Sequence, residues 1–250
     1  MRLTSNELVR ALKAEGVRVQ RVALDGRAWP NNTSAGSFNP HGILNHHTGA
    51  GSDAVLVKLL WRGRPGLDGP LCHIGLGRDG TAYLVGWDNA NHAGQGDPDV
   101  LKAVLAERSL PVANQSTTDG NPHFWGIEVM NNGTGEPYPL VQLNALIKIN
   151  AAICRLSGWS EKSCIHHREW TPRKIDMSWQ GPLRPMIAEC LSKPPGVWQI
   201  SGLAPVKPAV GPNTLAAIKA ARAGLKWAIS AKKPGEVAKW KKVLSALGSK

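Results

Sequence analysis

Several features that would narrow the function are scarce in this 250-residue chain. No segment is apolar over the roughly 20 residues that a membrane-spanning helix needs, and the first residues show no apolar signal core. The 4 cysteines form neither a CxxC pair nor a dense framework, which is typical of free thiols in a reducing compartment. The sequence therefore argues against an integral membrane protein and predicts synthesis in the cytoplasm.

Tyrosine and phenylalanine are also scarce, with 2 residues of each, whereas the chain has 10 tryptophans. A flat indole face stacks well on a sugar ring, so some tryptophans could line a groove for a carbohydrate or a peptide. The alternative is packing in the hydrophobic core. The composition leaves both explanations open.

Positive charge is concentrated near the C-terminus. The formal net charge is +12, and residues 194–250 contribute 10 Lys and Arg against the single acidic residue Glu236. This segment therefore carries +9, and the first 193 residues carry +3. A basic segment on a nearly neutral body indicates an anionic partner, which could be nucleic acid, a membrane or an acidic polymer.

Strand-like and helix-like segments alternate along the first 193 residues. Thr4 and Glu7 form the pattern of a capping box that opens a helix, and Gly16 ends that helix. Short strands are expected near 17–24, 42–44, 72–77, 81–85 and 124–130, and further helices near 53–60, 97–108 and 140–156. This alternation favours an α/β domain whose functional site lies at strand ends and in loops.

The remainder of the chain has a different composition. Prolines recur through residues 194–212, which predicts a linker. Residues 213–250 contain two amphipathic stripes separated by Pro234-Gly235, which predicts a small helical hairpin with lysines on its outer faces. We therefore expect three parts: a catalytic domain over 1–193, the linker, and a basic helical segment that could anchor the protein to a cell wall or membrane.

Two histidine pairs, His46-His47 and His166-His167, lie about half a chain apart, and Asp176 follows the second pair. A catalytic zinc site takes three protein ligands of these kinds and leaves its fourth position for water. Adjacent residues of an extended segment point to opposite faces, so only one histidine of each pair would reach a shared metal. The pattern by itself does not say which one.

Two more charged residues stand out beside these pairs. Glu128 lies inside an apolar strand, where an ionisable side chain needs a reason, although a surface carboxylate is the plain alternative. Lys174 and Asp176 are two residues apart, so on an extended segment their side chains share a face.

Taken in order, five motifs between about residues 40 and 180 resemble those of the type-2 N-acetylmuramoyl-L-alanine amidases. This family includes phage endolysins and the peptidoglycan recognition proteins. The motifs are His46-His47-Thr48, Arg78-Asp79-Gly80, Asn91-His92-Ala93-Gly94, Gly126-Ile127-Glu128, and His167-Arg168-Glu169-Trp170 followed by Arg173-Lys174-x-Asp176. The resemblance implies a mixed central β-sheet flanked by helices.

The resemblance also implies roles for particular residues. Zinc would be bound by the first histidine of the early pair, the second histidine of the late pair and the aspartate, which are His46, His167 and Asp176. Glu128 would orient a water molecule and take its proton, and Lys174 would stabilise the oxyanion. His92 and His73 would bind the substrate, although a hydrogen-bonded loop histidine is the alternative for His92.

The sequence departs from the family pattern at two places. The loop before the lysine is one glycine short, as Pro172-Arg173-Lys174, which puts the shape of the loop in doubt. Cys72 stands where some members carry a tyrosine on the hairpin strand, and those lacking the tyrosine often carry the strand glutamate instead. We interpret Cys72 as a small packing residue and not as a metal ligand.

The resulting hypothesis is zinc-dependent hydrolysis of the amide bond between N-acetylmuramoyl and L-alanine in peptidoglycan. The protein would act as a phage endolysin, made in the host cytoplasm and active on the cell wall after release. The alternative is an inactive peptidoglycan-binding module, although such members typically lose a metal ligand and all three are present. A nucleic-acid binder is a third possibility that the basic tail suggests, but the body contains no recognition motif for it.

The basic tail generates a prediction. If the tail holds the enzyme on an anionic surface, a chain ending near residue 195 should cleave small soluble muropeptides normally but lyse whole cells poorly. The advantage of the full chain should fade with salt, because the Debye length falls from about 10 Å at 0.1 M to about 3 Å at 1 M. Equal losses on soluble and cellular substrates, together with a lower melting temperature, would instead show that the tail only stabilises the fold.

Overall fold

The computed structural model describes residues 3–30, 36–202 and 238. The chain divides into two compact units, Met1–Ala204 and Pro205–Lys250. The helical hairpin expected over 213–250 lies outside the described residues apart from Ala238, and so does the linker beyond residue 202. Every helix and strand named below belongs to the first unit.

The described part of the first unit contains short strands and six α-helices. The helices are α1 (Ser5–Ala14), α2 (Asp53–Arg62), α3 (Pro98–Leu105), α4 (Leu140–Ser157), α5 (His167–Trp170) and α6 (Leu183–Leu191), with a 3₁₀ turn at Glu161–Ser163. The strands are β1 (Arg18–Arg21), β2 (Ala23–Leu24), β3 (Arg27–Ala28), β4 (Gly42–His47), β5 (Gly63–Arg64), β6 (Leu67–Asp68), β7 (Ile74–Leu76), β8 (Thr81–Leu84), β9 (Gln95–Gly96), β10 (Thr118–Asp119), β11 (Phe124–Val129) and β12 (Cys164–His166).

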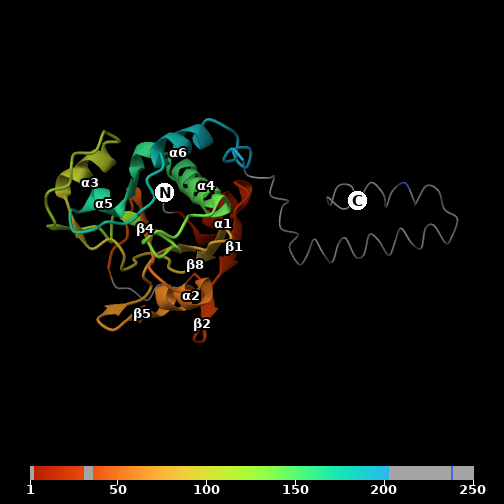
Figure 1. Ribbon diagram of the computed structural model, residues 1–250, viewed down its shortest axis with the longest axis horizontal. Helices are drawn as coiled ribbons and strands as arrows, with labels where there is room; N and C mark the ends of the chain where they lie inside the picture. The colour runs from red at the N-terminus through yellow and green to blue at the C-terminus, as the bar shows by residue number, and fades with distance from the viewer. Residues whose placement is uncertain (1–2, 31–35, 203–237, 239–250) are drawn as a thin grey trace. The chain divides into compact units, whose positions relative to one another are not determined.

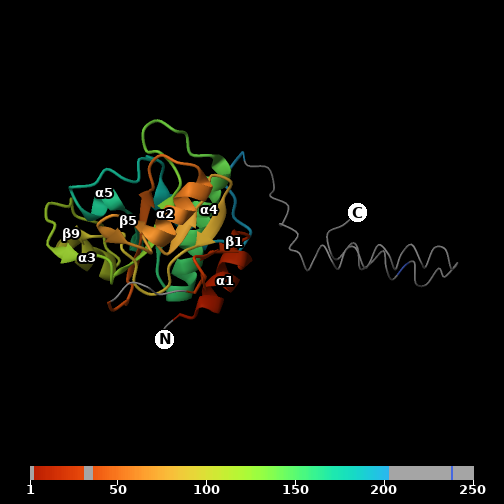
Figure 2. The ribbon, with the colours of Figure 1, turned by 90° about the horizontal axis from the view of Figure 1, so that it is seen from below.

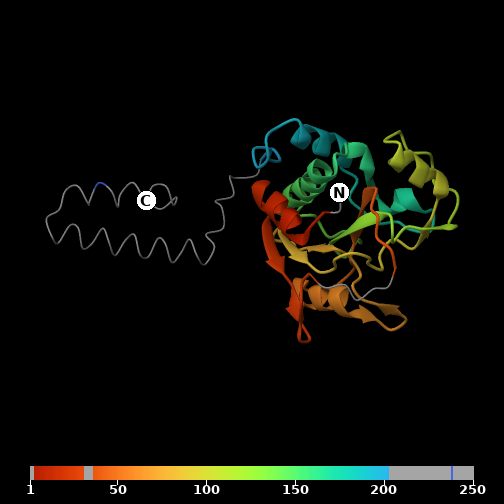
Figure 3. The same cartoon turned by 180° about the vertical axis from the view of Figure 1, so that it is seen from behind.

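Six strands form the central sheet in the order β1-β8-β7-β11-β4-β12. Strands β7, β11, β4 and β12 run parallel, whereas β8 is antiparallel to β7 and parallel to β1. Helices α1, α4 and α6 cover one face and α2 covers the other (Figures 1 and 3). From below, α3 and α5 lie at the end of the sheet away from α1 and β1 (Figure 2). The expected mixed sheet flanked by helices is confirmed.

Local signals explain several element boundaries. The capping box at the start of α1 is present, since the Glu7 backbone donates to the Thr4 side chain and Thr4 to the Glu7 carboxylate. The predicted hairpin joins β7 to β8, and Gly80 adopts a left-handed φ of 80° at its turn. The strand expected at 42–44 continues to His47, so both early histidines belong to β4.

Helix α4 is buried along most of its length against the sheet. Two of its buried polar residues tie it to the sheet. The Gln142 side-chain amide nitrogen donates to two backbone carbonyls at the ends of β7 and β11. Asn150 exchanges hydrogen bonds with Asn45 of β4, at 3.0 and 3.2 Å. A reciprocal amide pair in the core fixes the register of α4 on β4, because a shift would leave buried polar groups unpaired.

The segment after α6 packs on this core. Trp198 and Ile200 are buried with the α4 cluster, and the Ile200 backbone N–H donates to Asn144 at 3.0 Å. The composition assigned these residues to a linker, yet through residue 202 the chain contacts the first unit. A truncation that leaves the core intact therefore ends at residue 204 instead of near 195.

The composition is also explained by packing. All 4 cysteines are buried free thiols, and Cys72 lies in the cluster beneath α2. Five of the ten tryptophans are core residues: Trp29, Trp61, Trp125, Trp170 and Trp198. Within the described ranges, no helix has the length and hydropathy needed to cross a membrane.

Candidate metal centre

The site is assembled across neighbouring strands at the carboxyl ends of the parallel part of the sheet. His46 of β4 is paired with Glu128 of β11, and Glu128 is paired in turn with Gly75 of β7. On the other side, Asn45 is paired with His166 of β12, and His167 follows directly. Sheet register therefore brings His46, Glu128 and His167 side by side although they are far apart in the sequence.

Alternation along β4 decides which histidine faces the site. Asn45 points towards α4, where it bonds Asn150, so its neighbour His46 points to the opposite face. His47 returns to the α4 side, where its Nδ1 accepts from the Ser178 backbone N–H at 3.1 Å. The side chain of His46 is 1% exposed, which shows that its functional atoms are screened from bulk water.

Three ligand-type atoms meet at this point. His46 Nδ1 lies 2.8 Å from His167 Nδ1, and Asp176 Oδ2 lies 3.2 and 2.9 Å from these two nitrogens. In the described part of the chain, these three residues form the one group of histidine, cysteine or carboxylate side chains able to hold a metal ion. The sequence expectation named the same three residues.

The hydrogen bonds on the far side of each ring identify the acceptor atoms. His167 Nε2 lies 3.1 Å from the Ala93 carbonyl oxygen, which only accepts, so His167 carries its proton on Nε2. His46 Nε2 lies 3.1 Å from His92 Nδ1, and His92 Nε2 lies 3.0 Å from the Phe124 carbonyl. By the same reasoning His92 is protonated on Nε2, and His46 donates to its Nδ1.

This arrangement has a consequence for the three facing atoms. Burial and the neighbouring His167 lower the pKa of His46 to about 4, so His46 is neutral at pH 7. The two Nδ1 nitrogens and the Asp176 carboxylate oxygen therefore face one another at distances that would let one metal ion contact all three. Two histidines and one carboxylate are the kinds of ligand that a catalytic zinc ion takes.

Asp176 is held in place by a residue whose role the motif did not reveal. The Arg168 backbone N–H donates to the Asp176 carbonyl, and its guanidinium donates to the carbonyls of Met177 and Trp179. Arg168 thus fixes the segment that carries Asp176 against the start of α5. Glu169 in turn bonds Arg184 of α6 at 2.6 Å. In the sequence, the one hint of this positioning role is that Arg168 directly follows the candidate ligand His167.

Glu128 lies on the same face as His46. Burial and the Asp176 carboxylate raise its pKa well above the usual value, whereas Lys174 opposes this shift. One carboxylate oxygen, Oε2, is buried and has no hydrogen-bond partner. A partly buried carboxyl with a raised pKa and an unpartnered oxygen is suited to accept and release a proton.

Lys174 lies in the exposed loop after α5, and its charge acts on both His46 and Glu128. Lys174 is therefore an exposed residue whose charge affects the pKa values of His46 and Glu128. The expectation that the Lys174 and Asp176 side chains approach the same centre stays a prediction.

The two histidines expected to bind substrate have both ring nitrogens engaged within the protein. His73 Nδ1 accepts from the Gly126 N–H at 2.8 Å, and its Nε2 donates to the Asp88 carbonyl at 2.6 Å. Burial lowers the pKa of His73 to about 4. His92 bridges His46 and the Phe124 carbonyl as described above. Neither ring presents a free nitrogen for a ligand.

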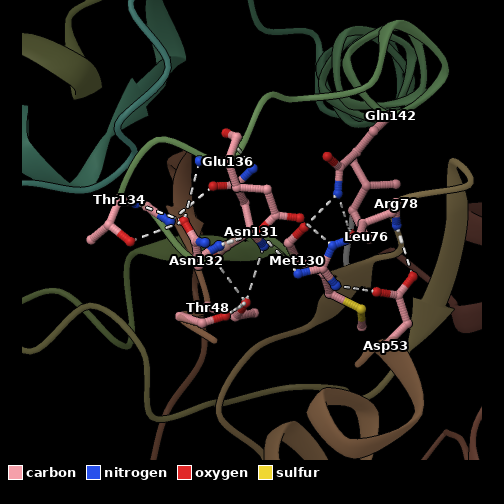
Figure 4. Close-up of polar contacts among 12 residues, drawn as sticks. Thr48, Asp53, Leu76, Arg78, Met130, Asn131, Asn132, Thr134, Glu136 and Gln142 are labelled. Carbon is pink, nitrogen blue, oxygen red and sulfur yellow. Dashed lines mark hydrogen bonds and ion pairs between the residues drawn. The ribbon is translucent and has the colours of Figure 1, made fainter. Parts of the chain in front are cut away.

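A polar network fixes the loop beside His47. Figure 4 shows Arg78 of the hairpin turn between Asp53, at the start of α2, and Glu136. Arg78 donates to these carboxylates at 2.5 Å, and Glu136 Oε2 accepts from the Asn132 backbone at 2.8 Å. These bonds fix the loop that contains Gly133 against the His47 ring. A Cβ added at Gly133 would lie 2.3 Å from that ring. The network links α2, the hairpin and the site edge.

Comparison with known proteins agrees with this geometry. The family model for N-acetylmuramoyl-L-alanine amidase matches residues 36–179, which is more than half of the chain. The chain belongs to the type-2 amidase family. The candidate ligands His46, His167 and Asp176, together with Glu128 and Lys174, lie within the matched range.

Several solved structures of amidases and related proteins are similar to this chain. The endolysin amidase LysCS from Clostridium intestinale is 18% identical, with a TM-score of 0.48, 69% of this chain and 94% of that chain covered. The PlyG catalytic domain is 12% identical, with a TM-score of 0.41 and coverages of 75% and 98%. Drosophila peptidoglycan recognition protein SA is 14% identical, with a TM-score of 0.38 and coverages of 66% and 86%. No curated protein sequence matches the chain.

The opposite orientations of His46 and His47 generate a prediction. Replacing His46 with alanine would remove one of the three candidate ligand atoms, so zinc affinity should fall by at least about 100-fold. His47→Ala is the matched control and should bind zinc nearly as the parent protein does, because His47 faces Ser178. Competition with a chromogenic chelator measures both. Loss of zinc in His47→Ala with retention in His46→Ala would contradict the register described here.

Proposed function

We propose that this amidase-family protein hydrolyses the amide bond between the N-acetylmuramoyl lactyl group and L-alanine in peptidoglycan. The observation that supports the proposal most directly is the convergence of His46, His167 and Asp176 beside the partly buried carboxyl of Glu128. A catalytically inactive binding module of this family would have no need for a complete ligand set next to a proton-accepting group.

The metal ion in the proposal is zinc, held by His46, His167 and Asp176. Two imidazole nitrogens and one carboxylate oxygen are ligands that zinc accepts readily, and the three atoms leave a further coordination position open. Zinc bound there would supply a water molecule of lowered pKa and polarise the scissile carbonyl. The two hydrogen bonds from the Nε2 atoms orient the imidazoles for this role.

Glu128 and Lys174 provide the proton transfer and the charge stabilisation. Glu128 would take a proton from the attacking water at its unpartnered oxygen and then donate it to the leaving amine of L-alanine. The raised pKa suits this double role, because the carboxyl holds the proton between the two transfers. The Lys174 ammonium would face the carbonyl oxygen as it gains negative charge.

The proposed biological setting is that of a phage endolysin, made in a bacterial host and acting on the cell wall after release. Membership of a family that includes endolysins supports this setting. The +9 charge of residues 194–250 adds support, because an anionic wall polymer or membrane surface would attract it.

The proposal predicts both the products and the role of Glu128. Incubation with purified peptidoglycan should release free L-alanine amino groups, detected by mass analysis, without new reducing sugar ends. Glu128→Gln should keep zinc and fold but lose turnover by about 100-fold or more. In the parent protein kcat/KM should rise with pH through a pKa above the usual glutamate value, because a base must be ionised to accept a proton.

The controls separate the alternatives. A chelator should abolish the release of amino groups, and added zinc should restore it. New reducing ends would overturn the amidase assignment altogether. Normal turnover in Glu128→Gln, with the acid limb of the pH profile unchanged, would assign the proton transfer to another group.

A further inference from the structure

The loop between β8 and β9 contacts both candidate ligand histidines at once. The His92 side chain bonds His46 Nε2, and the next carbonyl along the chain, that of Ala93, accepts from His167 Nε2. Two consecutive residues therefore determine on which nitrogen each histidine carries its proton. The motif that contains them was expected to contact substrate.

The loop is itself firmly fixed by a side chain outside the motif. Asn121 Oδ1 accepts hydrogen bonds from the backbone N–H groups of His92, Ala93 and Gly94, at 3.0, 2.8 and 3.4 Å. The Gly94 carbonyl then accepts from the indole of Trp170, at the end of α5. The loop is thus held between the turn before β11 and the helix that begins with His167.

The sheet provides a space for the His92 ring at one position. Gly126 lies on β11 two residues before Glu128, and a Cβ there would come within 2.6 Å of the His92 ring. The ring also packs edge-on against His73 at a centroid distance of 5.5 Å. Because Gly126 has no side chain, the His92 ring fits beside β11 and can contact both the Phe124 carbonyl and His46.

We propose that the His92–Gly94 loop is the outer hydrogen-bonding layer of the metal centre and that His92 is a positioning residue. His92 holds His46 with its proton on Nε2, and the Ala93 carbonyl does the same for His167, so that both Nδ1 atoms are bare and face the metal. This inference rests on the proposed zinc site, and it replaces the expectation that His92 binds substrate. Outer partners of this kind typically change metal affinity by about 10–100-fold.

The first measurement uses the zinc-free full-length protein. Long-range ¹⁵N–¹H correlation spectra report which ring nitrogen of each histidine is protonated. In the parent protein His46 and His167 should both be protonated on Nε2. In His92→Phe, His46 should become a mixture of both forms, whereas His167 should be unchanged because its partner is a backbone carbonyl. A His46 signal that is the same in both proteins would overturn the inference.

The second measurement is zinc affinity, by competition with a chromogenic chelator. His92→Phe should bind zinc about 10–100-fold more weakly. His92→Gln should recover part of the loss, because its amide can donate to Phe124 and accept from His46. His166→Gln, a change at another buried histidine beside a ligand, is the matched control and should leave affinity within about twofold. Equal affinity in His92→Phe and the parent protein would contradict the proposal.

Two further variants keep the test decisive if His92→Phe does not fold. Gly126→Ala displaces the His92 ring without altering any hydrogen-bonding group, and Asn121→Ala releases the loop. Both should weaken zinc binding, and unchanged affinity in both would overturn the inference. The outcomes also separate this inference from the proposed function. A parent protein that binds no zinc would refute the proposed function, whereas the His46 spectra of the zinc-free protein would still decide the role of His92.

Discussion

The structure depends on keeping three acceptor atoms together in a buried place. Two bare imidazole nitrogens lie 2.8 Å apart, and one carboxylate oxygen lies about as close to each. Burial lowers the pKa of His46 to about 4, so its ring is uncharged at neutral pH. The surrounding protein holds the three atoms in position, which is what the proposed metal ion requires.

Hydrogen bonds from several helices, strands and loops hold these three side chains in position. The Asn45–Asn150 pair fixes β4 on α4, so that His46 faces away from the helix. Arg168 fixes the segment of Asp176, and the loop at His92 fixes the far side of both rings. Each contact joins a site residue to a different element. This connection explains how residues from loops and strand ends can be held together in one arrangement.

Much of this could be predicted from the sequence, for identifiable reasons. Apolar periodicity and the Thr4–Glu7 capping box located most elements, because local patterns specify them. Motif order indicated His46, His167 and Asp176 as a group, and the resemblance to amidases selected one histidine of each pair. The alternation of β4 then explains that selection physically, since Asn45 is committed to α4.

Other features depended on contacts that no local pattern reveals. His92 was expected to contact substrate, because its motif does not show that both its nitrogens are engaged within the protein. The role of Asn121 was not foreseen, since it acts through backbone groups 27 to 29 residues away. Similarly, proline-rich composition predicted a linker from residue 194, whereas Trp198 and Ile200 complete the core. Long-range packing overrode local composition there.

We propose that His46 on β4, His167 after β12 and Asp176 together form a single zinc site. Diffraction from crystals grown with zinc, recorded on both sides of the zinc absorption edge, tests this proposal. We expect one strong anomalous peak in the first unit, bonded to His46 Nδ1, His167 Nδ1 and the Asp176 carboxylate. A peak bonded to His47 or His166, or no peak near Asp176 in a protein that retains its fold, would contradict it.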